Sequence, residues 1–254
     1  MGTGICQKSA MQVGAILREA WEFYRQHLLL MVALVATIWV PCELFSSYMD
    51  YYVIGEDNFR QSFKLSQFLD NFFGIIATAA VISVVMNSMQ GQSSGYLGSL
   101  EKGFSFWGKM WWMRFVQGLL LLCLFILLIL PGIYFMVRWS LAEAVVVSEG
   151  MTGLKALRRS RELTMDRFWP LFWLGVFPFL IFLFPLGIYI LLITVDERFD
   201  LWWVDAAFSL SLDFIGSYGT VVLVCAYRTA LQSTSPVEAP VGLSRLRPPT
   251  AEQW

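Results

Sequence analysis

Charged residues are scarce in this chain and apolar residues are abundant. Of its 254 residues, 15% are Asp, Glu, Lys or Arg, against about 25% in soluble domains. Apolar residues make up 57%, and 21 Phe and 11 Trp are among them. This is more apolar surface than one soluble core buries, so the composition excludes a water-soluble enzyme domain, a disordered chain and a nucleic-acid-binding protein. It predicts an integral membrane protein with several spans.

The residues of the common catalytic and metal sites are also few. His27 is the only histidine, and the cysteines at positions 6, 42, 123 and 225 have no metal-ligand or redox spacing. That pattern excludes a disulfide scaffold and argues against a zinc site. There is no GxGxxG or GxxxxGK[ST] motif, and the Gly- and Ser-rich stretch 91–95 is interpreted as a linker. The sequence therefore predicts no enzyme activity, no cofactor and no metal ion.

Apolar stretches of the required length occur along most of the chain. A helix that crosses a bilayer needs about 20 apolar residues. The stretch 111–148 is too long for one crossing, because 38 helical residues extend about 57 Å. Pro131 and Gly132 lie in its middle and predict a turn there. The predicted spans are 28–50, 68–89, 113–130, 132–147, 168–195 and 203–231.

The alternative is five spans, with Pro131 as a kink in one helix, since proline kinks occur in membrane helices. The distribution of basic residues favours six. With six spans, 14 of the 18 Lys and Arg residues lie on the side of both termini, and Arg60, Lys64 and Arg198 lie on the other. With five spans, the basic residues of 155–167 would move across and the asymmetry would largely vanish. By the positive-inside rule both termini are cytoplasmic.

Each pair of spans is preceded by a segment of helical periodicity, at 13–27, 97–111 and 152–169. Such helices lie along the membrane interface, with basic and aromatic side chains at headgroup level. The unit of one interfacial helix and one helical hairpin thus occurs three times, and PGIY at 131–134 resembles PLGIY at 185–189. The predicted fold is an all-α, six-span membrane domain over 1–231, followed by a disordered tail over 232–254. The basic and aromatic residues assigned to the interface are Arg158, Arg159, Arg161, Arg167, Trp107, Trp111 and Trp169.

The sequence of residues 131–169 resembles the membrane domain of some bacterial glycerophosphoryl diester phosphodiesterases and related stand-alone inner-membrane proteins. The matching positions are Pro131 to Ile133, Arg138, Glu149-Gly150, Ala156 to Ser160, Leu163-Thr164 and Phe168-Trp169. The family usually has an aromatic residue where this chain has Arg161. Because the phosphodiesterase chemistry of that family belongs to a separate soluble domain, the resemblance implies a membrane module and not an esterase.

Ionisable residues within a span are candidates for function, because a charge in the bilayer is costly. Arg138 and Asp213 fall about 10 Å and about 15 Å from the outer ends of their spans, by the helical rise. We expect these two side chains to pair, with Glu143 as the competing partner of Arg138. The pair is interpreted as a contact between helices, and a transport or proton-relay role is the alternative.

The sequence favours a non-enzymatic multi-pass protein of the bacterial cytoplasmic membrane that acts through lipid or protein contacts. Its expected partners are membrane lipids and a membrane or peripheral protein, with no nucleic acid, and the sequence gives no indication of oligomeric state. One alternative is a transporter of a small solute or a lipid that uses its intramembrane charges. The other is a module that cooperates with a separate glycerophosphodiester phosphodiesterase.

Overall fold

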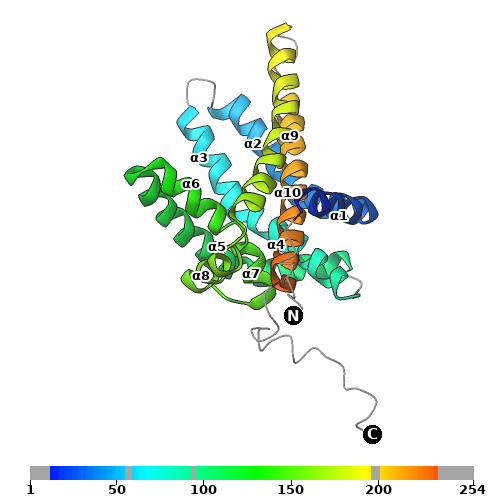
Figure 1. Ribbon diagram of the computed structural model, residues 1–254. Coiled ribbons are helices and arrows are strands. Elements are labelled where there is room, and N and C mark those ends of the chain that lie inside the picture. Colours follow the sequence, from blue (N-terminus) through cyan, green and yellow to red (C-terminus); the bar gives the residue numbers. More distant parts are fainter. Residues whose placement is uncertain (1–11, 55–58, 93–94, 196–200, 234–254) are drawn as a thin grey trace, which may run out of the picture.

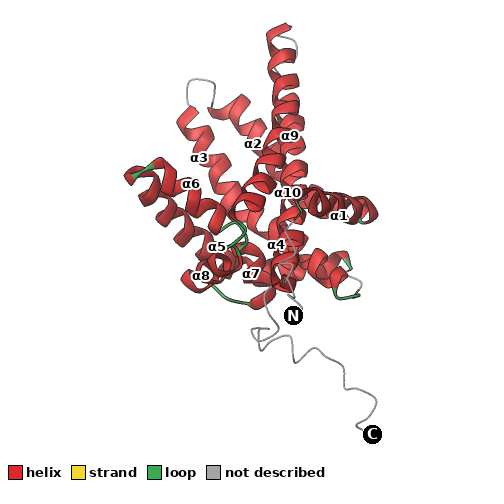
Figure 2. Cartoon of the chain, in the orientation of Figure 1, coloured by secondary structure: helices red, strands yellow, loops and turns green. Residues whose placement is uncertain are grey.

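The computed structural model describes residues 12–54, 59–92, 95–195 and 201–233. Over these ranges every regular element is helical (Figure 2). Residues 232 and 233 of the predicted tail 232–254 belong to the last helix. The rest of the predicted tail and the acidic segment 196–200 lie outside the described residues. The elements are α1 (Val13–Gln26), α2 (Leu28–Met49), η1 (Asp50–Ile54), α3 (Phe59–Leu69), η3 (Asp70–Gly74), α4 (Ile75–Met89), α5 (Tyr96–Leu127), α6 (Ile129–Arg138), α7 (Ala142–Glu149), α8 (Leu154–Leu163), α9 (Phe168–Val195) and α10 (Trp202–Ser233).

Six stretches of helix in the described residues are long and apolar enough to cross a membrane, which confirms the predicted number of spans. η1 extends the first span beyond α2, and η3 joins α3 to α4 in the second. Both are single turns of π-helix, so the helical path continues through them. The six stretches are Leu28–Ile54, Lys64–Met89, Tyr96–Leu127, Ile129–Glu149, Phe168–Leu191 and Trp202–Ser233.

The third stretch is longer than predicted, because α5 is one continuous helix of 32 residues. The predicted helix at 97–111 is therefore continuous with the third predicted span, and the predicted boundary between them was wrong. Proline is absent from α5, so its backbone has no interior break. At the helical rise α5 is about 48 Å long, and it crosses the other helices obliquely (Figure 1).

The chain reverses between α5 and α6, but three residues earlier than predicted. Leu128 has an extended backbone and separates the two helices, whereas Pro131 lies in the first turn of α6, where a missing N–H costs nothing. α5 and α6 then lie side by side (Figure 1). A Cβ at Gly132 would stand 2.6 Å from the Phe125 ring, so glycine here permits the close approach of the two arms.

The fourth stretch is not a single helix. α6 ends at Arg138, residues Trp139 to Leu141 form a turn, and α7 begins at Ala142. The Arg138 carbonyl accepts hydrogen bonds from Ser160 Oγ at 2.9 Å and from Thr164 Oγ1 at 3.2 Å. Side chains of α8 and its C-terminal cap thus satisfy a backbone group next to the break, as a low-dielectric environment requires.

Of the predicted interfacial helices, the first has the predicted bounds to within one residue, and the third ends earlier than predicted. α1 covers Val13–Gln26, within one residue of the prediction, and lies across α10 (Figure 1). α8 ends at Leu163, and Phe168 and Trp169 belong to α9, so the predicted continuation to 169 was wrong. The backbone turns at 164–166, where Thr164 caps α8 by donating to the Arg161 carbonyl.

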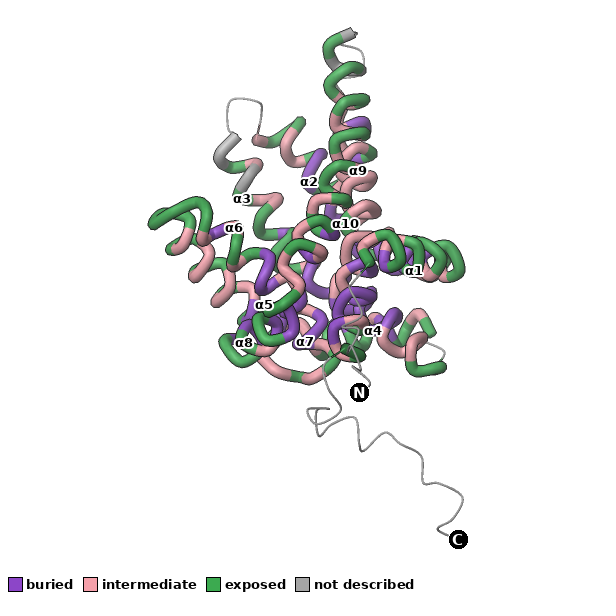
Figure 3. Tube along the Cα trace, viewed as in Figure 1, coloured by how far each residue is buried: buried purple, intermediate pink, exposed green. Residues whose placement is uncertain are grey.

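Buried residues gather where α4, α7 and the C-terminal half of α10 meet (Figure 3). α4 is buried along almost its whole length from Ile75 to Val85. By contrast, most large apolar side chains are exposed in α9, and so are most of those at the C-terminal end of α5 and the N-terminal end of α6 (Figure 3). Apolar exposure of this extent suits contact with lipid chains, which are as apolar as leucine.

Replacing Gly103 with alanine should lower the stability of the protein. A Cβ at this position would lie 2.7 Å from the Ile76 carbonyl oxygen of α4, and the backbone of a packed helix cannot move aside freely. We expect a loss of about 1–3 kcal/mol, measured by thermal unfolding in detergent.

The matched control is Gly108→Ala on the same helix, where a Cβ meets no heavy atom within 4 Å. Alanine favours a helix over glycine by about 0.5–1 kcal/mol, so this variant should be unchanged or more stable. Equal unfolding temperatures for the two variants would contradict the packing of α5 on α4.

Candidate functional site

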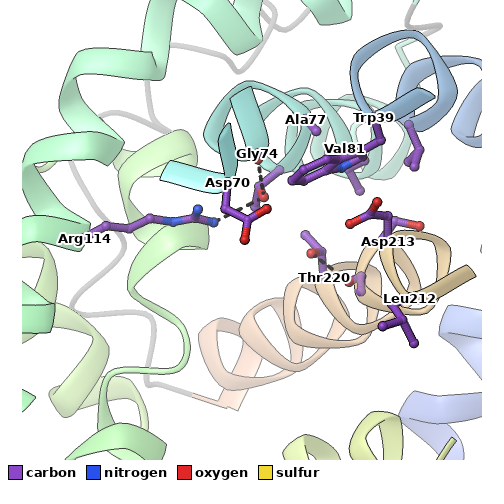
Figure 4. A pocket seen from close by; sticks show the side chains of 13 residues that line it. Trp39, Asp70, Gly74, Ala77, Val81, Arg114, Leu212, Asp213 and Thr220 are labelled. Carbon is purple, nitrogen blue, oxygen red and sulfur yellow. Dashed lines mark hydrogen bonds between the residues drawn. The ribbon is translucent and has the colours of Figure 1, made fainter. Parts of the chain in front are cut away.

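A pocket of about 300 Å³ lies among α2, η3, α4, α5 and α10 (Figure 4). Five of its lining residues belong to α10, at the spacing that places them on one helical face. A Cβ at Gly216 would meet no heavy atom within 4 Å, so this face looks onto open space. The five residues are Leu212, Asp213, Gly216, Ser217 and Thr220.

Arg114 of α5 forms the polar end of the pocket. Its Nε donates to Glu143 Oε1 of α7 at 2.7 Å, and its Nη2 donates to Thr78 Oγ1 of α4 at 3.2 Å. Thr78 in turn donates to the Gly74 carbonyl at 2.8 Å. One guanidinium thus joins three helices, and in Figure 4 it points toward Asp70.

Asp70 and Asp213 bring two carboxylates into the pocket from opposite sides (Figure 4). Oδ2 of Asp213 is buried, and no donor in the described part of the chain reaches it. A buried carboxylate oxygen without a donor is costly. Asp213 therefore brings to the pocket wall a carboxyl group with one oxygen that the surrounding described residues leave without a donor.

The expected pairing of Arg138 with Asp213 was wrong. Arg138 is 8% exposed and its Nη2 donates to Tyr134 Oη at 2.8 Å, within α6. Its Nε and Nη1 have no hydrogen-bond partner among the described residues. Glu143 does not compete for it, because that carboxylate pairs with Arg114. The break after Arg138 separates it from α7, which carries Glu143.

Three of the four arginines assigned to the interface make contacts of different kinds, and the fourth is exposed. Arg159 forms ion pairs with Glu149 at 3.3 Å and Glu162 at 3.5 Å. Arg161 lies over the Phe135 ring at 5.9 Å. Arg167 donates to the Leu163 carbonyl at 2.9 Å and to Ser233 Oγ, and Arg158 is exposed.

The tryptophans assigned to the interface also differ among themselves. Trp107 donates from Nε1 to the Phe72 carbonyl at 2.8 Å, which ties α5 to η3. Trp111 stacks on Phe115 with ring centroids 5.6 Å apart. Trp169 is exposed. None of these rings lines the polar pocket, and Trp39 of α2 supplies its aromatic wall (Figure 4).

Arg114 was not among the predicted site residues, because the distribution of basic residues places it at the cytoplasmic end of the predicted span 113–130. A signal was present: Arg114 stands between Trp111-Trp112-Met113 and Phe115, an apolar setting for a charge. Asp70 lies near the start of the predicted span 68–89 and was not among the predicted site residues. No group of three or more His, Cys, Asp or Glu side chains in the described residues could hold a metal ion.

The pocket is tied to α1 through Ser217. Its hydroxyl donates to the Phe214 carbonyl at 2.7 Å, so Tyr24 Oη of α1 must be the donor in its 3.0 Å bond to Ser217 Oγ. Burial raises the pKa of the Tyr24 phenol, against a smaller lowering by the Ser217 bond. The phenol therefore keeps its proton and remains a donor.

Comparison of the chain with protein-family models, with curated proteins and with solved structures found no match. The resemblance of residues 131–169 to the phosphodiesterase membrane domain stays a prediction.

Removing the carboxylate of Glu143 should destabilise the protein more than removing an exposed one. Arg114 and Glu143 are 28% and 29% exposed, so Glu143→Gln should cost about 1–2 kcal/mol, the upper range for a charged hydrogen bond reduced for partial solvation. Glu19 pairs with Arg228 at 3.0 Å, but those side chains are 46% and 44% exposed. Glu19→Gln should change stability by less than about 0.5 kcal/mol.

The measurement is thermal unfolding in detergent of both single variants, with Arg114→Gln and the Arg114/Glu143 double variant to isolate the coupling. Additive losses in this cycle would show that the two side chains do not interact.

Proposed function

We propose that this chain is a non-enzymatic, six-span protein of the bacterial cytoplasmic membrane that binds a charged or polar molecule in the pocket of Asp70, Arg114 and Asp213. The observation that carries the proposal is the carboxyl group of Asp213, which lines a pocket with open space and whose buried Oδ2 has no donor among the described residues. Ionisable side chains within spans are retained at a cost and are associated with substrate and ion pathways. This observation favours the carrier alternative over lipid or protein contacts alone.

The interrupted fourth span supports the same proposal. Its break at Trp139 to Leu141 leads into α7, which carries the Glu143 partner of Arg114. In secondary transporters, discontinuous helices commonly contribute to the binding site near the middle of the bilayer. A break that brings a counter-charge to the pocket residue Arg114 is therefore consistent with binding inside the membrane.

We further propose that both termini lie in the cytoplasm, with three helical hairpins and with α1, the first half of α5 and α8 at the inner membrane surface. The support is the charge distribution: α8 alone carries Lys155, Arg158, Arg159 and Arg161. A concentration of basic residues of this kind is retained on the cytoplasmic side.

A reporter inserted after Gly150 tests this orientation. Fused at this point, between the fourth span and α8, a periplasmically active phosphatase should be inactive and a cytoplasmically active fluorescent protein should fold. The reverse result, with the segment near residue 150 outside, would overturn the six-span topology and favour five spans.

Single cysteines introduced on α10 test whether water reaches the pocket. In a variant whose native cysteines are replaced, Gly216→Cys and Thr220→Cys should react with a water-soluble thiol reagent about tenfold or more faster than Ile215→Cys. The reason is that the thiolate is the reactive form and an apolar setting suppresses it. Ile215 is at the same depth as Gly216, but it lines an apolar groove with Leu17 and Phe177. Equally slow reaction at all three positions would remove the proposed binding pocket.

A further inference from the structure

A second cavity adjoins the polar pocket on the α3 and α5 side. It has a volume of about 590 Å³ and lies between residues 64–71 and residues 111–122. Much of its wall is apolar, and the side chains of Phe68, Leu119 and Leu122 are more than half exposed. In a membrane this groove, which we call the lateral groove, opens onto lipid.

The lateral groove and the polar pocket share one residue, Arg114. The ionisable residues that line the groove are Lys64 and Arg114, both cationic. Beyond Arg114, the polar pocket adds the carboxylates of Asp70 and Asp213. The order from the lipid side inward is therefore apolar wall, guanidinium, carboxylates.

We propose that the ligand of this site is a phospholipid whose headgroup carries both a phosphate and a primary ammonium group, and that it enters sideways through the lateral groove. The phosphate lies at Arg114, the ammonium reaches Asp70 and Asp213, and an acyl chain lies along Phe115, Leu119 and Leu122. This inference rests on the proposed function, since it names the molecule that the polar pocket receives.

The donors and acceptors of this headgroup match those of the site. A guanidinium has five N–H donors. Among the described residues, Arg114 has hydrogen-bond partners at Nε and Nη2, so donors remain for a phosphate oxygen. An ammonium has three donors, which match the two carboxyl groups that line the pocket, those of Asp70 and Asp213.

Other classes of ligand use only part of the site. An anionic phospholipid without an amine would leave Asp213 unsatisfied and would place negative charge near two carboxylates. A small soluble amine would have no use for the apolar wall and would leave Arg114 without a phosphate. The zwitterionic lipid is the one class of these three that engages the wall, the guanidinium and the carboxylates together.

The test measures protection of the pocket by lipid. The full chain carrying Thr220→Cys, in the background without native cysteines, is alkylated in detergent micelles that contain phosphatidylethanolamine, phosphatidylglycerol or neither. Phosphatidylethanolamine should slow alkylation about tenfold, because a bound ligand protects in proportion to its concentration over its Kd. Phosphatidylglycerol and free phosphoethanolamine should leave the rate nearly unchanged.

A second measurement uses chains with all native cysteines in place. Phosphatidylethanolamine should raise the unfolding temperature of the wild type more than phosphatidylglycerol does, and Asp213→Asn should abolish the difference. Lys155→Met, which removes an exposed charge on α8, serves as the control and should keep it.

The outcomes separate this inference from the function on which it rests. Equal protection by both lipids would overturn the role of the ammonium, and protection by free phosphoethanolamine would overturn lateral entry. If Thr220→Cys is alkylated fast and no lipid slows the reaction, the lipid is not the ligand. The proposal of a water-filled binding pocket would then remain. No alkylation under any condition would remove the proposed function itself.

Discussion

The charge of Arg114 is the constraint on which the interior of this protein depends. The charge of a guanidinium in a membrane-spanning bundle must be compensated, because an unpaired charge in the bilayer is costly. Here Glu143 of α7 supplies the counter-charge and Thr78 of α4 supplies a further acceptor. The three helices are thereby held around one point, and the polar pocket and the lateral groove meet there. Packing of apolar side chains alone would not select that arrangement, because lipid chains offer equivalent contacts.

The second requirement is that every backbone group freed by a break finds a partner inside the protein. The fourth span meets it through α8, whose Ser160 donates to the Arg138 carbonyl as Thr164 does. At the end of α7, Glu149 pairs with Arg159 and accepts a hydrogen bond from Tyr227 Oη at 2.8 Å. Several positions of the stretch 131–169 that carry the resemblance to the phosphodiesterase membrane domain are thus those that join the broken span to α8. In this chain these residues make contacts that hold α6, α7 and α8 together. That structural role is a sufficient physical reason for these residue types to occur at these positions.

Length and hydropathy predict the six spans because the thickness of a bilayer sets the length of any crossing helix. They predict the ends of those helices less well. Pro131 marked the reversal only approximately, since proline is accommodated within the first turn of a helix and the extended residue is Leu128. The pairing of charges was not predictable from depth along the spans, because partners are selected by the rotation of each helix about its axis. Arg138 bonds to Tyr134 four residues back, whereas Arg114, which looked like a residue at the end of a span, occupies the centre of the site.

The rotation of α10 about its axis gives two of its faces different surroundings. Its face at Asp213, Gly216 and Thr220 looks into the polar pocket, while Phe214 and Tyr218 line an apolar groove with α1 and α9. Ser217 stands between the two faces and accepts from Tyr24. Because Ser217 has already donated its proton to its own helix, that bond requires a protonated tyrosine, and burial of Tyr24 ensures one. A helix outside the predicted spans is thus fixed to the wall of the pocket by a directional contact, and α1 and α10 cannot rotate independently without leaving buried polar atoms unsatisfied.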